Sequence, residues 1–449
     1  MIYKTLLILA ALSHWQCGLA LVLASESDVP AASFKNQVAS ILLDNCVACH
    51  GPKKAEGGYR IDTFDELVKP GDTGALPIDT AAANHSELLR RLTSSDPSER
   101  MPSDTAPLSG AQIDLVKRWV EQGAKFDGEK SSVPLNLVIP PRAYADPPAT
   151  YSVPTPLTAI AFSPDGSQLL VGGYHELTVW NVADGAIVRR IKNFNQRIHS
   201  IIFLADQKTI AVGGGEPGRN GEVRLVDFES ETLKGVVGRT GDVVLDLAMK
   251  PGGSNELAVA SADGLIKIFD ATKFSELRSI SNHADWVTAV AWSEDGSRLA
   301  SASRDKTSKV FDASNGELLA TYLGHAAPVR GVSFLPDGKQ VVSSGADKKI
   351  HRWEVEGAKK VTEVAVGGEA FKLVQQNSLL FAPCSDTQLR RIDLATNQVS
   401  HSLSGYTDWV VSTAMHPGTN CVAGGAMNGE VRLWNATDGS LIRSWIAKP

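Results

Sequence analysis

The chain has 449 residues, a formal net charge of −6 and a hydrophobic content of 43%. Its length exceeds the usual size of one domain, and its apolar content is too high for a disordered protein. Because no basic run interrupts this acidic balance, we expect no nucleic-acid partner.

Residues 1–24 are typical of a secretory signal peptide. Lys4 precedes an apolar run from Leu6 to Leu12, and small residues then offer cleavage after Ala20 or Ala24. The alternative is an uncleaved membrane anchor, but polar residues interrupt the segment before it reaches the length of a membrane span. We therefore expect a periplasmic, cell-surface or secreted protein with no integral membrane span after cleavage.

Residues 33–126 are predicted to form a small all-α domain. Ser33 is an expected N-cap, and the apolar residues after it recur at helical spacing. These apolar residues are Phe34, Val38, Ile41 and Leu42. Further helices are expected at 87–92 and at 109–123, and the latter begins with the capping-box sequence SGAQ.

The first predicted helix leads directly into the sequence CVACH, which contains Cys46, Cys49 and His50. In a Cys-x-x-Cys-His motif, both thiols bind haem through thioether bonds and the adjacent histidine is the proximal iron ligand. The alternatives are a redox dithiol or half of a zinc site. A helical flank is not the setting of a thioredoxin-like dithiol, and no second cysteine pair supplies further zinc ligands. We therefore predict one covalently attached haem c.

Three arrangements are open for the sixth ligand of the iron. Met101 lies in the sequence Arg-Met-Pro, where Pro102 ends any helix and leaves the thioether in a loop. A thioether ligand favours ferrous iron and suits electron transfer. The other arrangements are His85, whose place beside an expected helix start is more usual for an exposed side chain, and an open coordination position. We predict Met101, so that His50 and Met101 are the metal ligands.

The helical segment resembles the planctomycete-type cytochrome c domain. The motifs that carry the resemblance are CVACHG, Gly57–Asp62, Pro70–Asp72, Ser86–Leu89, Arg100–Pro102 and a closing helix from Leu108 to Ala124 with Trp119. The resemblance implies Cys46, Cys49 and His50 as haem-binding residues, and Met101 with them. It also implies a redox role in the periplasm or at the cell surface.

Seven prolines between residues 127 and 156 indicate a stiff, extended linker. From 157 to 447, short β runs recur with a period of about 42 residues. Each of the seven units contains an aromatic or aliphatic residue followed by an acid or an amide: Trp180-Asn181, Val226-Asp227, Phe269-Asp270, Phe311-Asp312, Trp353-Glu354, Ile392-Asp393 and Trp434-Asn435. We expect four strands in each unit, so that the ring closes without a strand from the N-terminal side. Cys384 and Cys421 are expected to be unpaired, buried thiols.

The repeats resemble the WD-repeat family, whose members fold as β-propellers. The most specific resemblance is a register that the family uses for a buried hydrogen-bonded tetrad. Two units share it, with His325, Ser343, Asp347 and Trp353 in the fifth and His283, Ser301, Asp305 and Phe311 in the fourth. Only the fifth unit is expected to hold a full network, because phenylalanine has no indole donor. A hydrolase triad is the alternative, but repeated offsets indicate architecture rather than one active site.

Together these features predict a multidomain protein, with a small all-α cytochrome c domain followed by an all-β seven-bladed propeller. The expected function is single-electron transfer through the haem, with the propeller docking a redox partner or another protein. The alternatives are a WD-repeat binding scaffold, a haem-based redox or gas sensor and, last, an oxidase-like enzyme. Because the repeats contain no cluster of acid, base and metal ligands, we expect no catalytic residues.

Overall fold

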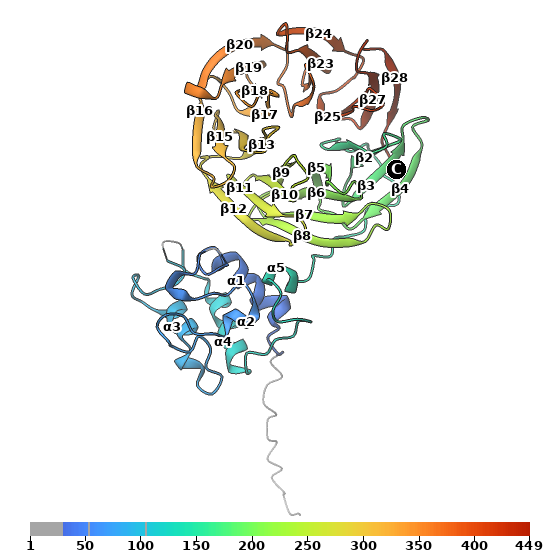
Figure 1. Ribbon diagram of the computed structural model, residues 1–449. Helices are drawn as coiled ribbons and strands as arrows, with labels where there is room; N and C mark the ends of the chain where they lie inside the picture. The colour runs from blue at the N-terminus through green and yellow to red at the C-terminus, as the bar shows by residue number, and fades with distance from the viewer. Residues whose placement is uncertain (1–29, 53, 104–105) are drawn as a thin grey trace, which may run out of the picture.

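The computed structural model describes residues 30–449 except 53 and 104–105. The predicted signal peptide, residues 1–24, lies outside the described residues. A small helical domain is followed by a ring of seven four-stranded sheets, as predicted from the sequence (Figure 1). Within the described residues, no helix has the length and apolar character needed to cross a membrane.

The helical domain begins where the sequence predicts. The Ser33 hydroxyl accepts a hydrogen bond from the Asn36 N–H, and a first wide turn (Phe34–Val38) continues as a regular helix. Ser109 and Gln112 form the predicted capping box. The α-helices are α1 (Ala39–Asn45), α2 (Phe64–Leu67), α3 (Glu87–Thr93), α4 (Gly110–Glu121) and α5 (Leu135–Val138).

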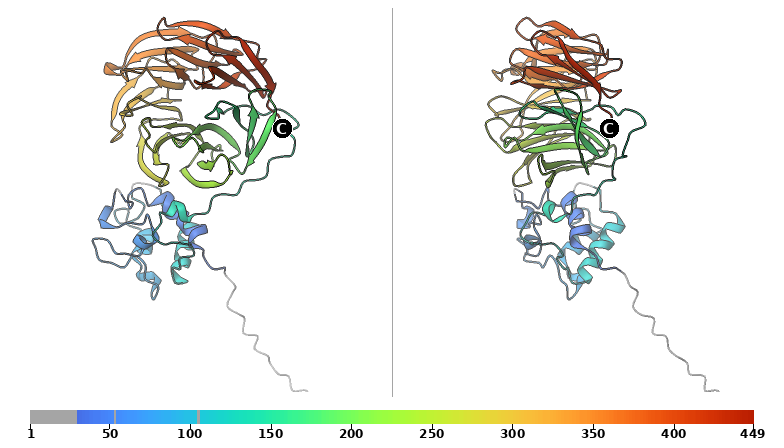
Figure 2. Two further views of the ribbon diagram at one scale, coloured as in Figure 1. Left: turned by 45° about the vertical axis from the view of Figure 1, so that its right-hand side comes forward. Right: turned by 90° about the vertical axis from the view of Figure 1, so that its right-hand side faces the viewer.

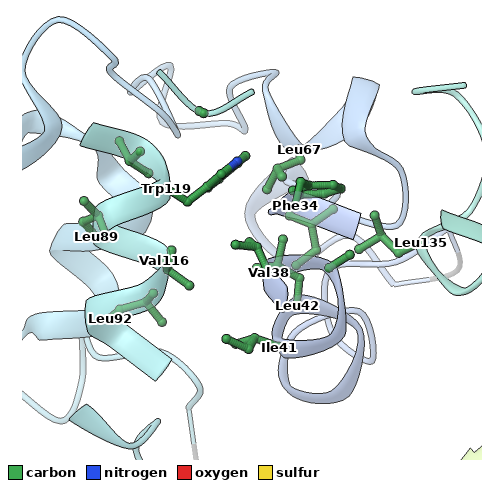
Figure 3. Packing of buried hydrophobic residues seen from close by; sticks show 14 of the residues in the cluster. Phe34, Val38, Ile41, Leu42, Leu67, Leu89, Leu92, Val116, Trp119 and Leu135 are labelled. Atoms are coloured by element: carbon green, nitrogen blue, oxygen red, sulfur yellow. The ribbon is translucent and has the colours of Figure 1, made fainter. Parts of the chain in front are cut away.

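One apolar core holds these helices together. Trp119 and Val116 of α4 point toward Phe34, Val38 and Leu42 at the start of the domain (Figure 3). The rings of Phe34 and Trp119 are 5.3 Å apart, and the Trp119 indole donates to the Lys125 carbonyl at 3.0 Å. The apolar part of the Trp119 indole is thus packed in the core, and its polar N–H has a hydrogen-bond partner.

Helix α5 lies within the segment 127–156, where the sequence indicated only an extended linker. Leu135 and Val138 belong to the core of the helical domain, and the Leu135 N–H donates to the Asp62 carbonyl at 2.8 Å. A single turn of helix is too short to produce a readable periodicity, which explains why sequence analysis did not predict it. The helical domain thus uses part of the proline-rich segment in its own core.

Seven blades form the ring, and each contains four consecutive antiparallel strands. Blades 1 to 4 consist of β1 (Ile160–Phe162), β2 (Gln168–Gly172), β3 (Glu176–Asn181), β4 (Ile187–Lys192); β5 (Arg197–Phe203), β6 (Thr209–Glu216), β7 (Asn220–Asp227), β8 (Leu233–Thr240); β9 (Val244–Met249), β10 (Glu256–Ser261), β11 (Leu265–Asp270), β12 (Ser275–Ser281); and β13 (Val287–Trp292), β14 (Arg298–Ser303), β15 (Ser308–Asp312), β16 (Leu318–Tyr322). Blades 5 to 7 consist of β17 (Val329–Phe334), β18 (Gln340–Gly345), β19 (Lys349–Glu354), β20 (Lys359–Ala365); β21 (Val374–Gln376), β22 (Leu379–Cys384), β23 (Gln388–Asp393), β24 (Gln398–Leu403); and β25 (Val410–His416), β26 (Cys421–Ala426), β27 (Glu430–Asn435), β28 (Leu441–Ile446).

Within each blade, the residues of the inner strands are more buried than those of the outer strand. The second strand, such as β26, is buried along its length, whereas the outer strand β28 alternates between exposed and half-buried residues. A continuous apolar run is expected where neighbouring sheets cover both faces of a strand. Cys384 and Cys421 lie at opposite ends of such second strands, buried and unpaired, as predicted.

The ring closes between blades 1 and 7 without an exchanged strand. Blade 7 contains its own outer strand, β28, and the Leu157 N–H donates to the Ala426 carbonyl at 3.1 Å. The Ser412 hydroxyl donates to the Leu157 carbonyl, just as the Thr158 hydroxyl donates to the Ile198 carbonyl between blades 1 and 2. The closing contact is therefore of the same kind as the contacts between other blades.

The tetrad of blade 5 is complete, as predicted. His325 Nδ1 lies 2.8 Å from Asp347 Oδ2, and His325 Nε2 lies 2.9 Å from the Ser343 hydroxyl. The Trp353 indole donates to the same hydroxyl at 3.2 Å. Burial lowers the pKa of His325, although Asp347 opposes this shift.

Blade 4 keeps this network except for the indole donor. His283 lies 2.8 Å from Asp305 and 2.7 Å from the Ser301 hydroxyl, while Phe311 replaces the tryptophan. In blade 7 an ideal Cβ on Gly424 would lie 2.2 Å from the Tyr406 hydroxyl. The tyrosine therefore occupies the space that the serine side chain takes in blades 4 and 5.

Ser343→Ala should destabilise the propeller more than Ser301→Ala. Both serines are fully buried. Ser343→Ala removes the hydrogen-bond partner of two ring nitrogens, one on His325 and one on Trp353. Ser301→Ala removes the partner of one ring nitrogen, on His283. Each buried polar group left unsatisfied costs about 1–3 kcal/mol of unfolding free energy. Urea unfolding of the two variants measures the difference. Equal losses would show that the indole bond contributes nothing.

The linker after α5 is bound along the propeller rather than free. At blade 2, the Tyr144 hydroxyl donates to Glu222 Oε1 at 3.0 Å, and the Tyr144 N–H donates to Asn193 Oδ1 at 3.0 Å. Glu222 is buried and accepts from Arg224 at 2.8 Å, and Arg224 in turn donates to the Arg142 carbonyl. Two opposite charges and a tyrosine from the linker thus share one buried network.

A second network of the same composition binds the linker to blade 1. The Tyr151 hydroxyl donates to buried Glu176 at 2.6 Å. Arg190 pairs with the same carboxylate at 2.6 Å and donates to the Pro148 and Ala149 carbonyls at 2.7 and 2.6 Å. Segment 142–151 is therefore part of the surface of the ring.

The helical domain lies at the rim of the ring, next to β8 and β12 (Figure 1). The Asn136 side chain of α5 donates to the Phe274 carbonyl, between β11 and β12. The rotated views show the helical domain beyond the outer strands, so it does not cover the centre of the ring (Figure 2). This position leaves the middle of the propeller accessible.

Tyr144→Phe should loosen the linker. The change removes one donor from buried Glu222 and should lower the unfolding free energy by about 1–3 kcal/mol. Trypsin cleavage after Arg142, whose carbonyl accepts from the same network, should become faster. Tyr174→Phe, at a more exposed tyrosine of blade 1, is the control and should change stability by less than about 0.5 kcal/mol. Unchanged cleavage in Tyr144→Phe would contradict this role.

Candidate haem-binding site

The CVACH sequence forms a tight turn at the end of α1. The Cys46 N–H donates to the Leu42 carbonyl at 3.0 Å, and the Cys49 and His50 N–H groups both donate to the Cys46 carbonyl, at 3.2 and 3.0 Å. Both thiols are unpaired and half-buried. The turn therefore presents two thiols and an imidazole from one short segment, beside the core residues of the domain.

The His50 ring is oriented by a backbone carbonyl. Its Nδ1 lies 3.2 Å from the Tyr59 oxygen, and the Ile61 N–H donates to the His50 carbonyl at 2.8 Å. A carbonyl can only accept, so Nδ1 carries the hydrogen and Nε2 keeps its lone pair. Metal-binding histidines are commonly held in this way, with one nitrogen bonded to a carbonyl and the other free for the metal. The residues present fit a haem in this respect.

Glycines let the surrounding loops approach closely. An ideal Cβ on Gly58, which has a φ of +65°, would lie 2.0 Å from the Asp72 carboxylate. One on Gly71 would lie 2.5 Å from the Gly57 carbonyl, and one on Gly51 2.5 Å from the Val47 carbonyl. In three of the motifs that resemble the cytochrome domain, glycine thus permits a close approach, to a side chain at Gly58 and to a backbone carbonyl at Gly71 and Gly51.

The Cys46 thiol is not activated, and the CVACH residues form no zinc-binding cluster. Burial raises the pKa of Cys46 to about 12, with smaller contributions from Asp44 and Cys49, so this thiol is not a thiolate at neutral pH. Among the described residues, only His325, Asp347 and His351 bring three metal-binding atoms within 4.8 Å of one another. Cys46, Cys49 and His50 therefore form no such group, which argues against the zinc alternative.

The structure leaves the sixth ligand as a prediction. Met101 is half-buried in the loop after α3, where its N–H donates to the Arg91 carbonyl at 2.9 Å. His85 is exposed and ends a short turn of helix. Among the described residues, neither side chain makes a hydrogen bond or an aromatic contact with His50.

The end of α1 also faces the propeller. Loss of solvent raises the pKa of Asp44, two residues before Cys46, and the positive charges of Arg239, Lys267 and Arg142 oppose the shift. Arg239 belongs to β8 and Lys267 to β11. The Asp44 carboxylate near the end of α1 is therefore influenced by positive charges at the rim of blades 2 and 3.

The cluster of His325, Asp347 and His351 in blade 5 is not a metal site. Both nitrogens of His325 are already bonded within the tetrad, and the two imidazole rings stack with centroids 4.0 Å apart. His351 Nδ1 lies 2.7 Å from the Tyr322 hydroxyl, and burial lowers the pKa of His351 to about 4. In two stacked imidazole rings the nitrogen lone pairs lie in nearly parallel planes, so they do not converge on one ion.

Sequence analysis found Cys46, Cys49 and His50 but not the residues that orient them. The role of Tyr59 belongs to its backbone carbonyl, which any residue carries, so no side-chain pattern could reveal it. Its hydroxyl is also used, and donates to the Leu67 carbonyl at 2.8 Å.

Comparison with known proteins confirms both predicted families. Residues 46–104 match the family described as planctomycete cytochrome C. The family described as WD domain, G-beta repeat, matches 146–181, 274–312, 316–354 and 397–435. The first of these matches begins inside the linker, at the segment bound to blade 1. A cytochrome c match supports haem binding by the helical domain, and WD repeats suggest protein–protein interaction.

The similar curated proteins match only part of this chain. The intraflagellar transport protein 122 homolog of Danio rerio is 24% identical over 139 residues, which is 30% of this chain and 11% of that protein. WD repeat and SOCS box-containing protein 1 of Homo sapiens is 30% identical over 123 residues, which is 26% of this chain and 28% of that protein. The chain thus covers less than a third of either relative.

Proposed function

We propose that the protein is an exported c-type cytochrome that carries one covalent haem and transfers single electrons, with a propeller for protein docking. The observation that carries this proposal is the CVACH turn, in which His50 Nδ1 is bonded to the Tyr59 carbonyl beside two unpaired thiols. Cys46 and Cys49 form the two thioether bonds, and His50 Nε2 binds the iron. The match to a cytochrome c family supports the same assignment.

When bound, the haem supplies a centre that gains and loses single electrons. The residues of the chain orient the proposed iron ligand and limit the access of water. The Tyr59 carbonyl fixes the tautomer and orientation of His50, and the apolar core behind Cys46 and Tyr59 limits the access of water. Met101 is the proposed sixth ligand, and its soft sulfur favours the ferrous state.

The propeller is proposed to dock a redox partner or another protein. The helical domain lies at the rim, next to β8, and leaves the centre of the ring uncovered (Figure 2). Trp286 and Trp409 occupy equivalent places before the inner strands β13 and β25, with 37% and 49% of their surface exposed. Exposed tryptophans are common in protein interfaces. In this proposal the chain is an electron carrier rather than an enzyme.

The apolar run in residues 1–24 supports export to the periplasm or the cell surface. The unpaired, buried thiols of Cys384 and Cys421 are compatible with an oxidising compartment, because neither thiol has a partner there with which to form a disulfide. This location is part of the proposal.

Cys46→Ser should lower the amount of haem that remains bound to the polypeptide after denaturation. The change removes one of the two proposed thioether bonds. Cys384→Ser is the control, since that thiol is buried in blade 6 and should leave the haem content unchanged. If Cys46→Ser retains as much covalent haem as the wild type, the proposed attachment is wrong.

Met101→Ala should open the sixth coordination position. The wild-type ferrous protein should have a low-spin optical spectrum that carbon monoxide does not alter, and the variant should have one that shifts when the gas is added. His85→Ala is the matched control and should behave as the wild type. A wild-type spectrum that already shifts with carbon monoxide would instead favour the haem-based sensor.

A further inference from the structure

A cavity of about 270 Å³ lies at the centre of the propeller, lined by residues of the inner strands. Five blades contribute a residue at which the register between the first and second strands shifts, so that it has no partner on the neighbouring strand. These residues are His199, Leu245, Thr288, Arg330 and Val411. A β-bulge redirects a side chain out of the sheet, and here the repeated bulges direct one residue from each of these five blades to the same space.

The ionisable residues that line the cavity are all basic. Arg330 and His199 come from bulges and Lys372 from the segment before β21, and no aspartate or glutamate of the described chain lines it. The two carboxylates that pair with Lys372 and Arg330, Asp246 and Glu369, are not among the residues that line the cavity. A ligand in the cavity therefore meets the cations before their counter-charges.

Arg330 is held in place by one nitrogen only. Its Nε donates to Glu369 at 2.5 Å, and within the described chain its two terminal amino groups have no hydrogen-bond partner. A guanidinium with both terminal amino groups available matches the two oxygens of a carboxylate. Arg330 thus has the geometry of a carboxylate-binding residue.

Lys372 also retains donor capacity. It pairs with Asp246, which is buried and accepts from the Leu247 and Val290 N–H groups at 2.8 and 3.1 Å. Its other contact is the Ser200 hydroxyl, at 3.3 Å. Because an ammonium group has three donors, one remains for a ligand, and the backbone bonds keep Asp246 in place without help from the lysine.

His199 provides a neutral polar group in the same space. Burial lowers its pKa to about 4, with a smaller contribution from Arg197, and its ring makes no hydrogen bond among the described residues. Trp286 and Phe371 supply aromatic walls. A cavity of this size, slightly below the usual range for ligand sites, fits a small molecule rather than a peptide.

We propose that the central cavity of the propeller binds a small organic carboxylate. Its carboxylate contacts Arg330 and Lys372, with His199 as a further hydrogen-bonding group, and its apolar body packs against Trp286 and Phe371. This site is separate from the proposed haem function and does not depend on it.

Titration calorimetry of the full chain with benzoate tests the assignment. Benzamide is the comparison, because it has the same shape without the charge. Benzoate should bind saturably with one site per chain, and benzamide should bind at least about tenfold more weakly, as expected when charged hydrogen bonds are lost. The optical spectrum of any bound haem, recorded during the titration, should remain unchanged.

Two variants locate the site. Lys372→Met should weaken benzoate binding at least about tenfold, while Asp246 keeps its backbone hydrogen bonds. Arg330→Gln should also weaken benzoate binding. It replaces Lys372→Met as the test variant if Lys372→Met is unstable. The control is Lys359→Met, at an exposed residue of β20, which should bind benzoate as the wild type does.

Several results would overturn the proposal. They are the absence of saturable benzoate binding, equal affinities for benzoate and benzamide, or unchanged binding in a folded Lys372→Met or Arg330→Gln variant. Tighter binding of inorganic phosphate than of benzoate would also overturn it, because the aromatic walls would then contribute nothing.

Discussion

A four-stranded sheet of this chain buries both faces only when another sheet covers each of them, and the ring satisfies this constraint. It explains why second strands such as β26 are buried throughout and why outer strands such as β28 alternate. It also explains the cavity, because seven blades bring seven inner strands around one axis. Bulges such as that at Arg330 then decide which side chains line it.

The same surface organises the rest of the molecule. The pairs Glu222–Arg224 and Glu176–Arg190, in both of which the carboxylate is buried, are completed by Tyr144 and Tyr151 of the linker. A charge pair taken out of water needs further hydrogen bonds to offset its desolvation, and the linker supplies them. The segment that connects the two domains is thereby bound to the ring, with α5 next to β8.

Local patterns in the sequence predicted the features whose cause is local. Ser33, the capping box of Ser109 and Gln112, and the tetrad register of His325 all behave as their spacing indicated. The CVACH motif likewise identified the two thiols and the imidazole of the candidate haem-binding site. Features that depend on distant partners were not predictable, because nothing near Tyr144 indicates Glu222, and the acceptor for His50 is a backbone carbonyl without a residue signature. Helix α5 was missed because one turn has no period.

The central claim is that Cys46 and Cys49 hold a single haem covalently. Mass spectrometry of the denatured, full-length protein, recovered from cells able to attach haem, tests this claim most directly. We expect the mass of the processed polypeptide plus one haem, and a tryptic fragment containing CVACH that carries the whole increment. A mass equal to that of the polypeptide alone would contradict the account.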